Sequence, residues 1–254
     1  MSFITRLFRL VFSIYGFIVF LALMFLLFPL VVIASFFGAI RGGNTIYNIC
    51  RFWADVAMFC WGIRHRNIHK APKVTDHAAV FVFNHVSYMD IPVILKTFRR
   101  QPVRILGKAE MAKIPIFGFI YSKAVVMVYR ADATARANSL RRLKAVLRKN
   151  ISIIVAPEGT FNMTNKPLKE FYNGAFNAAI ETQTPIQPVI FLDAYDRMPY
   201  ETIFSLNPGR SRSVFLEEIK VDGYTMEDVQ ELKSLVYQKM EEALINYNAS
   251  WIRN

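Results

Sequence analysis

The sequence contains no charged residue from position 10 to position 40, a stretch of 31 residues. Arg6 and Arg9 precede this stretch, and Arg41 follows it. A secretory signal has a shorter apolar core, so a cleaved leader is not expected. As one helix the stretch would measure about 46 Å, against roughly 30 Å of bilayer hydrocarbon. It is therefore too long for one upright membrane span.

A proline at position 29 allows this stretch to fit a membrane in two ways. Residues 10–28 could cross the bilayer as a transmembrane helix, or the whole stretch could bend into a helical pair within one leaflet. A buried core helix is the third alternative, although such helices rarely run this far without a charge. A second apolar stretch, residues 46–63, would lie in the headgroup zone or pack on the rest of the protein. We expect residues 1–69 to form a membrane-anchoring helical segment.

After residue 69, short apolar runs alternate with segments of helical periodicity. Strand character is seen in residues 78–83, 103–106, 125–129, 151–155, 186–191 and 214–219, and helical periodicity in residues 91–97, 134–150, 171–182 and 226–244. Strands that alternate with helices are typical of an α/β domain. We predict that residues 70–254 form such a domain, with a mostly parallel or mixed central sheet flanked by helices.

The positive charge of the chain is concentrated in its middle. The net charge is +12, and residues 96–149 contain 14 basic residues against Glu110 and Asp132. This charge indicates an anionic partner, such as nucleic acid, an anionic membrane surface or an acidic substrate. No nucleic-acid-binding signature is present, so nucleic acid is not an expected partner. The basic residues would form a solvated helix face or a surface that faces anionic lipid.

Cysteine and histidine usage argues against a disulfide scaffold and against a metal enzyme. The chain has two cysteines and four histidines, and none of the histidines belongs to an H-E-x-x-H motif. We therefore expect no metal.

Polar residues follow four of the expected strands at the point where each ends. Asn84 and His85 follow the first, Lys108 and Glu110 the second, Arg130 the third, and Pro157, Glu158, Gly159 and Thr160 the fourth. In an open parallel α/β sheet, ligands bind beyond the carboxyl ends of the strands. If these strands are parallel, the four groups meet at one edge of the sheet.

His85 is the candidate general base, and Asp90 is its candidate partner. Imidazole titrates near neutral pH, and a carboxylate on its far nitrogen would fix the tautomer and stabilise the imidazolium. Asp90 could reach His85 if residues 86–89 form a tight turn. Alternatively, Asp90 caps the helix that begins beside it, or it has both roles.

The order of these groups along the chain is the most specific feature. Asn-His-x4-Asp comes first, then Gly-Lys-x-Glu, an apolar strand that ends in Arg, Pro-Glu-Gly-Thr, and finally Pro-Ile-Gln-Pro-Val at 185–189. Over residues 70–220 this set resembles the glycerolipid acyltransferase family, in particular the PlsC-like 1-acylglycerol-3-phosphate acyltransferases. The resemblance implies acyl transfer from acyl-CoA or acyl carrier protein to lysophosphatidate. The product would be phosphatidate, for phospholipid biosynthesis, and no cofactor would be needed.

The same resemblance implies a role for each matching residue. His85 would activate the acceptor hydroxyl, with Asp90 as its partner. The acceptor would be bound by Lys108, Arg130, Glu158, Gly159 and Thr160, and Pro188 would lie on the donor side. The family also implies attachment to the cell membrane, with the catalytic domain on the cytoplasmic face.

Two positions depart from the family pattern. Phe161 stands where the family usually has Arg, and Tyr172 where Lys is common. Lys166 or Lys169 could compensate, or the acceptor is another lysolipid, such as a lyso-ornithine or lyso-glycine lipid. A non-enzymatic, membrane-tethered protein that binds anionic lipid is a further alternative, and it predicts that His85→Ala leaves function intact.

Overall fold

The computed structural model describes residues 3–71, 76–99, 101–129 and 133–253. Across these residues, seven strands form one sheet in the order β1-β7-β6-β2-β5-β3-β4. They are β1 (Ile63–His69), β2 (Val80–Phe83), β3 (Val103–Lys108), β4 (Val125–Val128), β5 (Ser152–Val155), β6 (Ile186–Phe191) and β7 (Gly209–Phe215). The run from β6 to β4 is parallel, β7 is antiparallel to β6, and β1 is parallel to β7. The sheet is therefore mixed and mostly parallel, which confirms the predicted class.

The prediction from the sequence is confirmed for the five strands β2 to β6, and it is wrong for β1 and β7, which form the outer part of the sheet. The strand expected at 214–219 begins at Gly209 and ends at Phe215, so most of it precedes the predicted range. Strand β1 was not predicted, because its sequence, Ile-Arg-His-Arg-Asn-Ile-His, is not an apolar run. It lies at the edge of the sheet, where charged side chains are exposed to solvent and discourage pairing with other chains.

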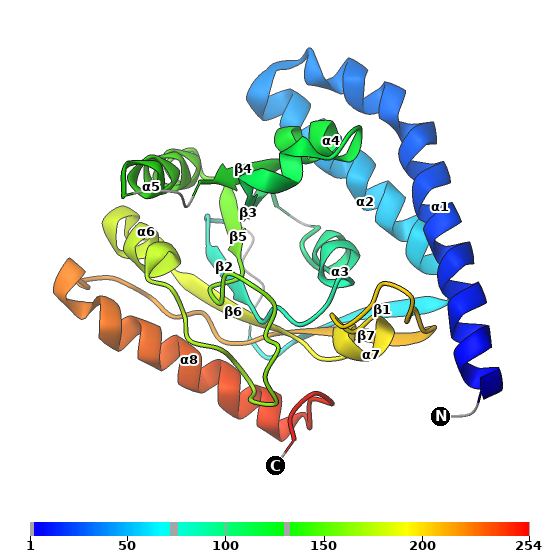
Figure 1. Ribbon diagram of the computed structural model, residues 1–254. Helices are drawn as coiled ribbons and strands as arrows, with labels where there is room; N and C mark the ends of the chain where they lie inside the picture. Colours follow the sequence, from blue (N-terminus) through cyan, green and yellow to red (C-terminus); the bar gives the residue numbers. More distant parts are fainter. Residues whose placement is uncertain (1–2, 72–75, 100, 130–132, 254) are drawn as a thin grey trace.

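Helices cover both faces of the sheet (Figure 1). One face is covered by α5 (Ala133–Leu147), α6 (Gly174–Thr182) and α8 (Val229–Asn246). The other face carries α1 (Phe3–Ser35), α2 (Gly43–Cys60), α3 (Asp90–Thr97), α4 (Phe117–Ala124) and α7 (Ala194–Arg197). Short helices also occur at Gly38–Gly42, Ala109–Lys113 and Met226–Asp228.

Side chains of the central strands point alternately to the two faces of the sheet. The hydrophobic core is therefore divided between the two layers of helices. In β2, Val80 and Val82 point into the core beneath α5, α6 and α8. Phe81 and Phe83 point to the opposite core, which includes residues of α2 and α3. This period of two is the geometry of a strand that is buried on both faces. Strand β2 is thus fixed in the middle of the fold, with the residues that follow it held at one edge.

The first two helices form a hairpin that packs on the sheet domain. Helix α1 continues through Pro29 without a break, and α2 returns alongside it. Helix α2 buries Tyr47, Ala54, Ala57 and Met58. Of the two alternatives for residues 46–63, packing on the rest of the protein is therefore the one observed. The division of the chain at residue 69 remains a prediction.

Helix α1 is held along its length by polar contacts. Near its start, Ser13 Oγ accepts a hydrogen bond from the backbone of Leu206 at 3.0 Å, and Trp61 Nε1 donates to the carbonyl of Gly16 at 3.1 Å. Beyond its end, Arg104 of β3 donates to the carbonyls of Ala39 and Ile40. The helix is thus attached to the sheet domain at both ends.

The outer face of α1 is apolar and exposed. By length and composition alone, residues Arg6–Ser35 could cross a membrane, and 22% of the most apolar window is buried inside the protein. The exposed side chains include Phe8, Val11, Phe17, Ile18, Leu26, Leu30 and Ile33. Such a large exposed apolar surface is typical of a contact with membrane or protein.

Candidate active site

Four parallel strands bring the predicted polar groups to one edge of the sheet. Strands β2, β5, β3 and β4 are neighbours and run in the same direction. Their carboxyl ends therefore lie together, as the sequence predicted. Arg130, the group expected after β4, lies outside the described residues.

His85 and Asp90 form a hydrogen-bonded pair in the turn between β2 and α3. His85 Nδ1 lies 2.6 Å from Asp90 Oδ2, and the same oxygen accepts the backbone N–H groups of Val86 and Ser87 at 3.1 Å each. Asp90 is the first residue of α3, but its hydrogen bonds go to the preceding turn. The capping role considered for Asp90 is therefore not observed. The carboxylate instead closes the turn and orients the imidazole.

The environment of Asp90 is strongly desolvated. The residue is 1% exposed, and burial raises the pKa of its carboxyl, against the lowering effects of His85 and the two amides. The imidazole of His85 is 25% exposed. With Nδ1 bound to the carboxylate, Nε2 is the nitrogen that can take a proton from a substrate.

Glu158 links the turn after β5 to the turn after β2. Its Oε1 accepts the backbone N–H of His85, and its Oε2 accepts that of Lys169, both at 2.9 Å. The residue is 1% exposed, and burial raises the pKa of its carboxyl to about 7. Gly159 follows with a φ of 71°, a backbone conformation that favours glycine. Glu158 therefore fixes the relative position of two loops.

An aromatic ring packs on the imidazole, and a cation contacts the neighbouring Pro-Glu-Gly-Thr turn. The ring of Phe161 lies 4.4 Å from that of His85 and 5.0 Å from that of Tyr88, measured between centroids. Lys169 Nζ donates to Thr160 Oγ1 at 2.8 Å. Of the two lysines that could compensate for the missing Arg, Lys169 is therefore the one with a side-chain contact to the Pro-Glu-Gly-Thr turn.

Of the two remaining predicted site residues, Lys108 is exposed and Pro188 is buried. Lys108 is exposed at the carboxyl end of β3. Pro188 is buried inside β6, where it is opposite Val82 of β2. Its carbonyl accepts the backbone N–H of Leu216 at 2.9 Å. The roles inferred for these two residues remain predictions.

An apolar groove of about 660 Å³ opens beside the His85 turn. Tyr88 and Met89, which belong to this turn, are part of its wall. The rest of the lining comes from α1, α2 with Trp61 just beyond it, α3 and α4, and from residues 111–116 and 198–206. Lining atoms are nearly all apolar, and the volume is in the range of small-molecule sites. The groove can hold a hydrocarbon chain whose polar end lies near His85.

Neither a free serine nucleophile next to His85 nor a metal site is seen in the described part of the chain. Ser87 is buried and donates to the carbonyl of Met198 at 2.5 Å, while its oxygen accepts the backbone N–H of Met89. It therefore serves the turn and is not free to act as a nucleophile. Within the described residues, no group of three His, Cys, Asp or Glu side chains could hold a metal ion.

A protein-family model described as Acyltransferase matches residues 62–192, which is 131 of the 254 residues. The chain belongs to the acyltransferase family. The matched range contains the whole polar edge of the sheet, from His85 to Thr160.

Curated relatives of this acyltransferase carry related names. This chain is 28% identical to the chloroplastic 1-acyl-sn-glycerol-3-phosphate acyltransferase of Arabidopsis thaliana, and the match covers 67% of this chain and 48% of that protein. It is 28% identical to the 1-acyl-sn-glycerol-3-phosphate acyltransferase of Haemophilus influenzae, over 65% of this chain and 68% of that protein. The chain thus spans about half the length of the Arabidopsis relative.

The fold of this acyltransferase is also that of a solved structure. The crystal structure of the 1-acyl-sn-glycerophosphate acyltransferase PlsC from Thermotoga maritima matches with a TM-score of 0.74. The match covers 95% of this chain and 98% of the other, at 21% sequence identity. The likeness therefore includes the α1–α2 hairpin as well as the sheet domain.

Sequence reasoning missed several features of this acyltransferase site. The contacts of Phe161 with His85 and Tyr88 join residues that are distant in sequence, and no spacing rule predicts them. The buried amide of Asn84 was grouped with His85, but its role in joining strands was not foreseen. It donates to the carbonyl of Phe191 at 3.1 Å and accepts the N–H of the same residue at 2.8 Å. The adjacency of Asn84 to His85 was the available signal.

The raised pKa of Glu158 predicts a pH-dependent stability. Because burial raises this pKa from 4.5 to about 7, the native state binds the proton more tightly than the unfolded state does. The free energy of unfolding should therefore fall as the pH rises from about 4.5 through 7. In Glu158→Gln this pH-dependent component should disappear. The variant should also be less stable at every pH, because the amide nitrogen cannot accept one of the two backbone N–H groups that Glu158 accepts.

Chemical denaturation at several pH values between 5 and 8 measures this slope. The exposed Glu227→Gln variant is the matched control, and it should follow the wild-type curve. Parallel curves for wild type and Glu158→Gln would contradict the assignment.

Proposed function

We propose that this protein transfers an acyl chain from a thioester donor to the free hydroxyl of 1-acylglycerol-3-phosphate, giving phosphatidate. We base this proposal on the His85–Asp90 pair and on the apolar groove that Tyr88 and Met89 of the same turn line. The family match and the printed names of the relatives support the acyl transfer and the acceptor. The donor would be acyl-CoA or acyl carrier protein.

In the proposed reaction, His85 acts as a general base and then as a general acid. Its Nε2 takes the proton of the acceptor hydroxyl, whose oxygen attacks the thioester carbonyl. The tetrahedral intermediate then collapses, the carbon–sulfur bond breaks, and the thiol leaves with the proton from the imidazolium. Asp90 stabilises the imidazolium and holds the tautomer. Because Ser87 is committed to the turn, we infer direct transfer without an acyl-serine.

The acceptor phosphate would be bound by the cations of the polar edge. Lys108 and Lys169 are the described candidates, and Arg130 follows β4 in the sequence. Gly159 and Thr160 would position the acceptor through the turn that Glu158 fixes. Pro188 would contribute on the donor side through the packing of β6 against β2.

We infer that α1 lies within one leaflet and does not span the bilayer. Its contacts with the sheet domain extend from Ser13 to Ala34, which are about 32 Å apart along the helix. An upright α1 would therefore draw the attached domain through the whole hydrocarbon layer. A helix that lies flat instead buries its apolar face, with Arg9 and Arg41 at the level of the anionic headgroups. The catalytic domain would face the cytoplasm, where thioester donors are found.

Labelling of both ends of α1 tests this orientation. Arg6→Cys and Arg41→Cys are made separately, with Cys50 and Cys60 replaced by alanine, and the proteins are inserted into sealed vesicles. An impermeant maleimide should label both positions from the same side of the membrane. Labelling from opposite sides would show that α1 spans the bilayer.

Asp90→Asn tests the proposed mechanism. The amide cannot stabilise an imidazolium as a carboxylate does, so kcat for transfer to lysophosphatidate should fall roughly 100- to 10,000-fold. The KM for the acceptor should change little, because Asp90 is buried away from it. Steady-state rates with labelled acyl donor measure both constants. Asp222→Asn, an exposed control, should keep full activity, and an unchanged kcat in Asp90→Asn would refute the role of this pair.

Another lysolipid acceptor is the second candidate, and the position of Phe161 favours it. This ring packs on His85, where the family usually has a cation that would attract a phosphate. A lyso-aminolipid would not need that charge. If lysophosphatidate is nonetheless the acceptor, Lys169 supplies the cation from the other side of the turn.

Phe161→Arg separates the two acceptors. A new guanidinium next to the acceptor should raise kcat/KM for lysophosphatidate about tenfold and lower it for a lyso-aminolipid. Phe161→Leu is the control, because it keeps the site apolar. Transfer by the wild type to a lyso-ornithine lipid, but not to lysophosphatidate, would favour the second candidate. The reverse selectivity would exclude it.

A further inference from the structure

Helix α5 presents a surface of unpaired cations. Its sequence contains no acidic residue. Four cations are exposed: Arg141 and Arg142 in the second half of the helix, and Arg148 and Lys149 just beyond its end. Lys144 is the cation in this region that pairs with a carboxylate, that of Glu181. Within the described part of the chain, the four exposed cations are in no ion pair. We call them the α5 basic surface.

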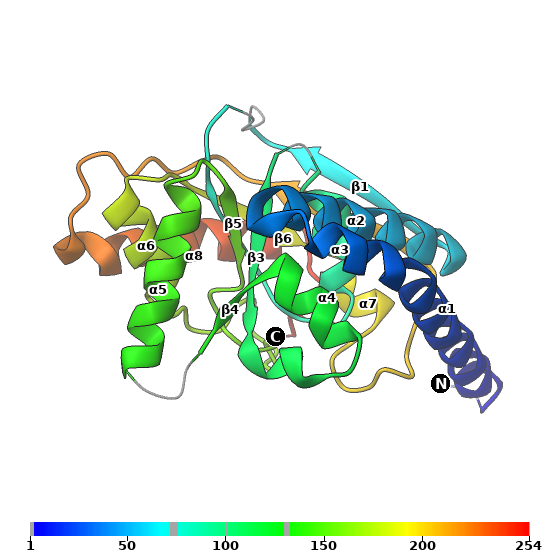
Figure 2. The ribbon, with the colours of Figure 1, turned by 90° about the horizontal axis from the view of Figure 1, so that it is seen from above.

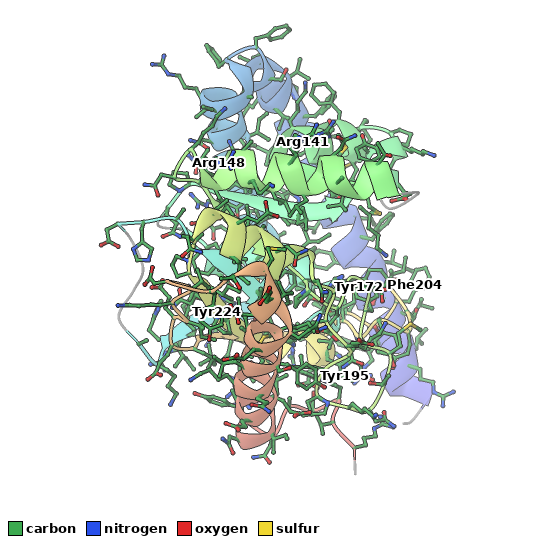
Figure 3. The ribbon with its side chains drawn as sticks, turned by 90° about the vertical axis from the view of Figure 1, so that its left-hand side faces the viewer. Arg141, Arg148, Tyr172, Tyr195, Phe204 and Tyr224 are labelled. Carbon is green, nitrogen blue, oxygen red and sulfur yellow. The ribbon has the colours of Figure 1, made fainter. Side chains whose placement is uncertain are left out.

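The α5 basic surface lies on the side of the molecule opposite α1. Figures 1 and 2 show α5 and α1 at opposite ends, with the sheet between them. Figure 3 views the molecule from the α5 side, with Arg141 and Arg148 labelled and α1 behind. If the apolar face of α1 is in the membrane, the α5 basic surface points toward the aqueous phase. Its charge is therefore available to a soluble anionic partner.

A second cavity, of about 560 Å³, connects this helix with the candidate active site. It lies between α5 and α6, and at its other end it reaches Pro157 and Gly159, which flank Glu158. Its walls are apolar, with polar atoms from Ser139, Asn173 and Asn177. Among the described residues, no cation lines it. The cavity therefore suits an uncharged chain with amide groups better than a phosphate.

One polar atom of this cavity wall has no partner. Asn177 Oδ1 is buried without a hydrogen bond in the described structure. A buried acceptor without a partner costs free energy, so a rotation of this amide toward the cavity would let a ligand N–H satisfy it. The amide groups of a pantetheine chain provide such donors.

On the basis of the proposed function, we propose that the α5 basic surface docks an acidic acyl carrier protein. The pantetheine arm of the carrier would lie in the second cavity and bring its thioester to His85, while the acyl chain enters the apolar groove. From Arg141 to Lys149 the cations extend about 12 Å along a convex helix, with the small Ala145 between them. Such a surface complements an acidic helix, whereas the phosphates of a single CoA nucleotide would need cations gathered in one pocket.

Charge reversal tests this docking in the full-length protein. The double variant Arg141→Glu/Arg148→Glu is compared with Lys220→Glu/Lys239→Glu, which makes the same change of charge elsewhere. Rates are measured with an acylated carrier protein and with acyl-CoA of the same chain length, using lysophosphatidate as the acceptor. The α5 variant should raise the KM for the carrier at least about tenfold, with kcat and all acyl-CoA kinetics unchanged. The wild-type KM for the carrier should also rise with salt.

A binding measurement separates failure of this proposal from failure of the proposed function. Fluorescence anisotropy of a labelled carrier protein should report binding to the wild type and the control variant, but not to the α5 variant. That result supports docking even if lysophosphatidate is not the acceptor. The proposal is overturned if the α5 variant loses activity equally with both donors, if it binds the carrier like the wild type, or if its main loss is in binding to anionic vesicles.

Discussion

The buried carboxylate of Asp90 accepts three hydrogen bonds through one oxygen, from His85 and from the amides of Val86 and Ser87. These hydrogen bonds set the shape of the turn and the orientation of the imidazole. It is formed in a site that is 1% exposed, where an unsatisfied charge would be expensive. The rest of the polar edge is arranged around this turn. The ring nitrogen that faces the substrate is therefore defined by the fold before any substrate binds.

Glu158 is a second buried carboxylate that fixes a turn by accepting backbone N–H groups, here in the turn after the neighbouring strand β5. By accepting the backbone N–H groups of His85 and Lys169, it holds the turn after β5 against the turn after β2. The apolar groove lies on the α1 side of this junction and the second cavity on the α5 side. The junction is therefore where an acyl chain coming from one face and a polar carrier coming from the other can meet His85.

The parallel strands and the polar residues at their ends could be predicted, because buried strands are apolar runs and chemistry gathers at their carboxyl ends. Strand β1 could not be predicted, since an edge strand with Arg64, His65 and Arg66 has no apolar signature. The packing of Phe161 on His85 could not be predicted either, because it depends on how two distant turns meet. The position of α1 against the domain also depends on long-range contacts, such as that between Ser13 and Leu206.

We propose that His85 activates the acceptor hydroxyl of lysophosphatidate. Phosphatidate formation from lysophosphatidate and a labelled acyl donor tests this role, in membranes with equal amounts of folded wild type or His85→Ala. The wild type should form product, and the variant should form at least about 100-fold less. Equal product formation by the two proteins would contradict it.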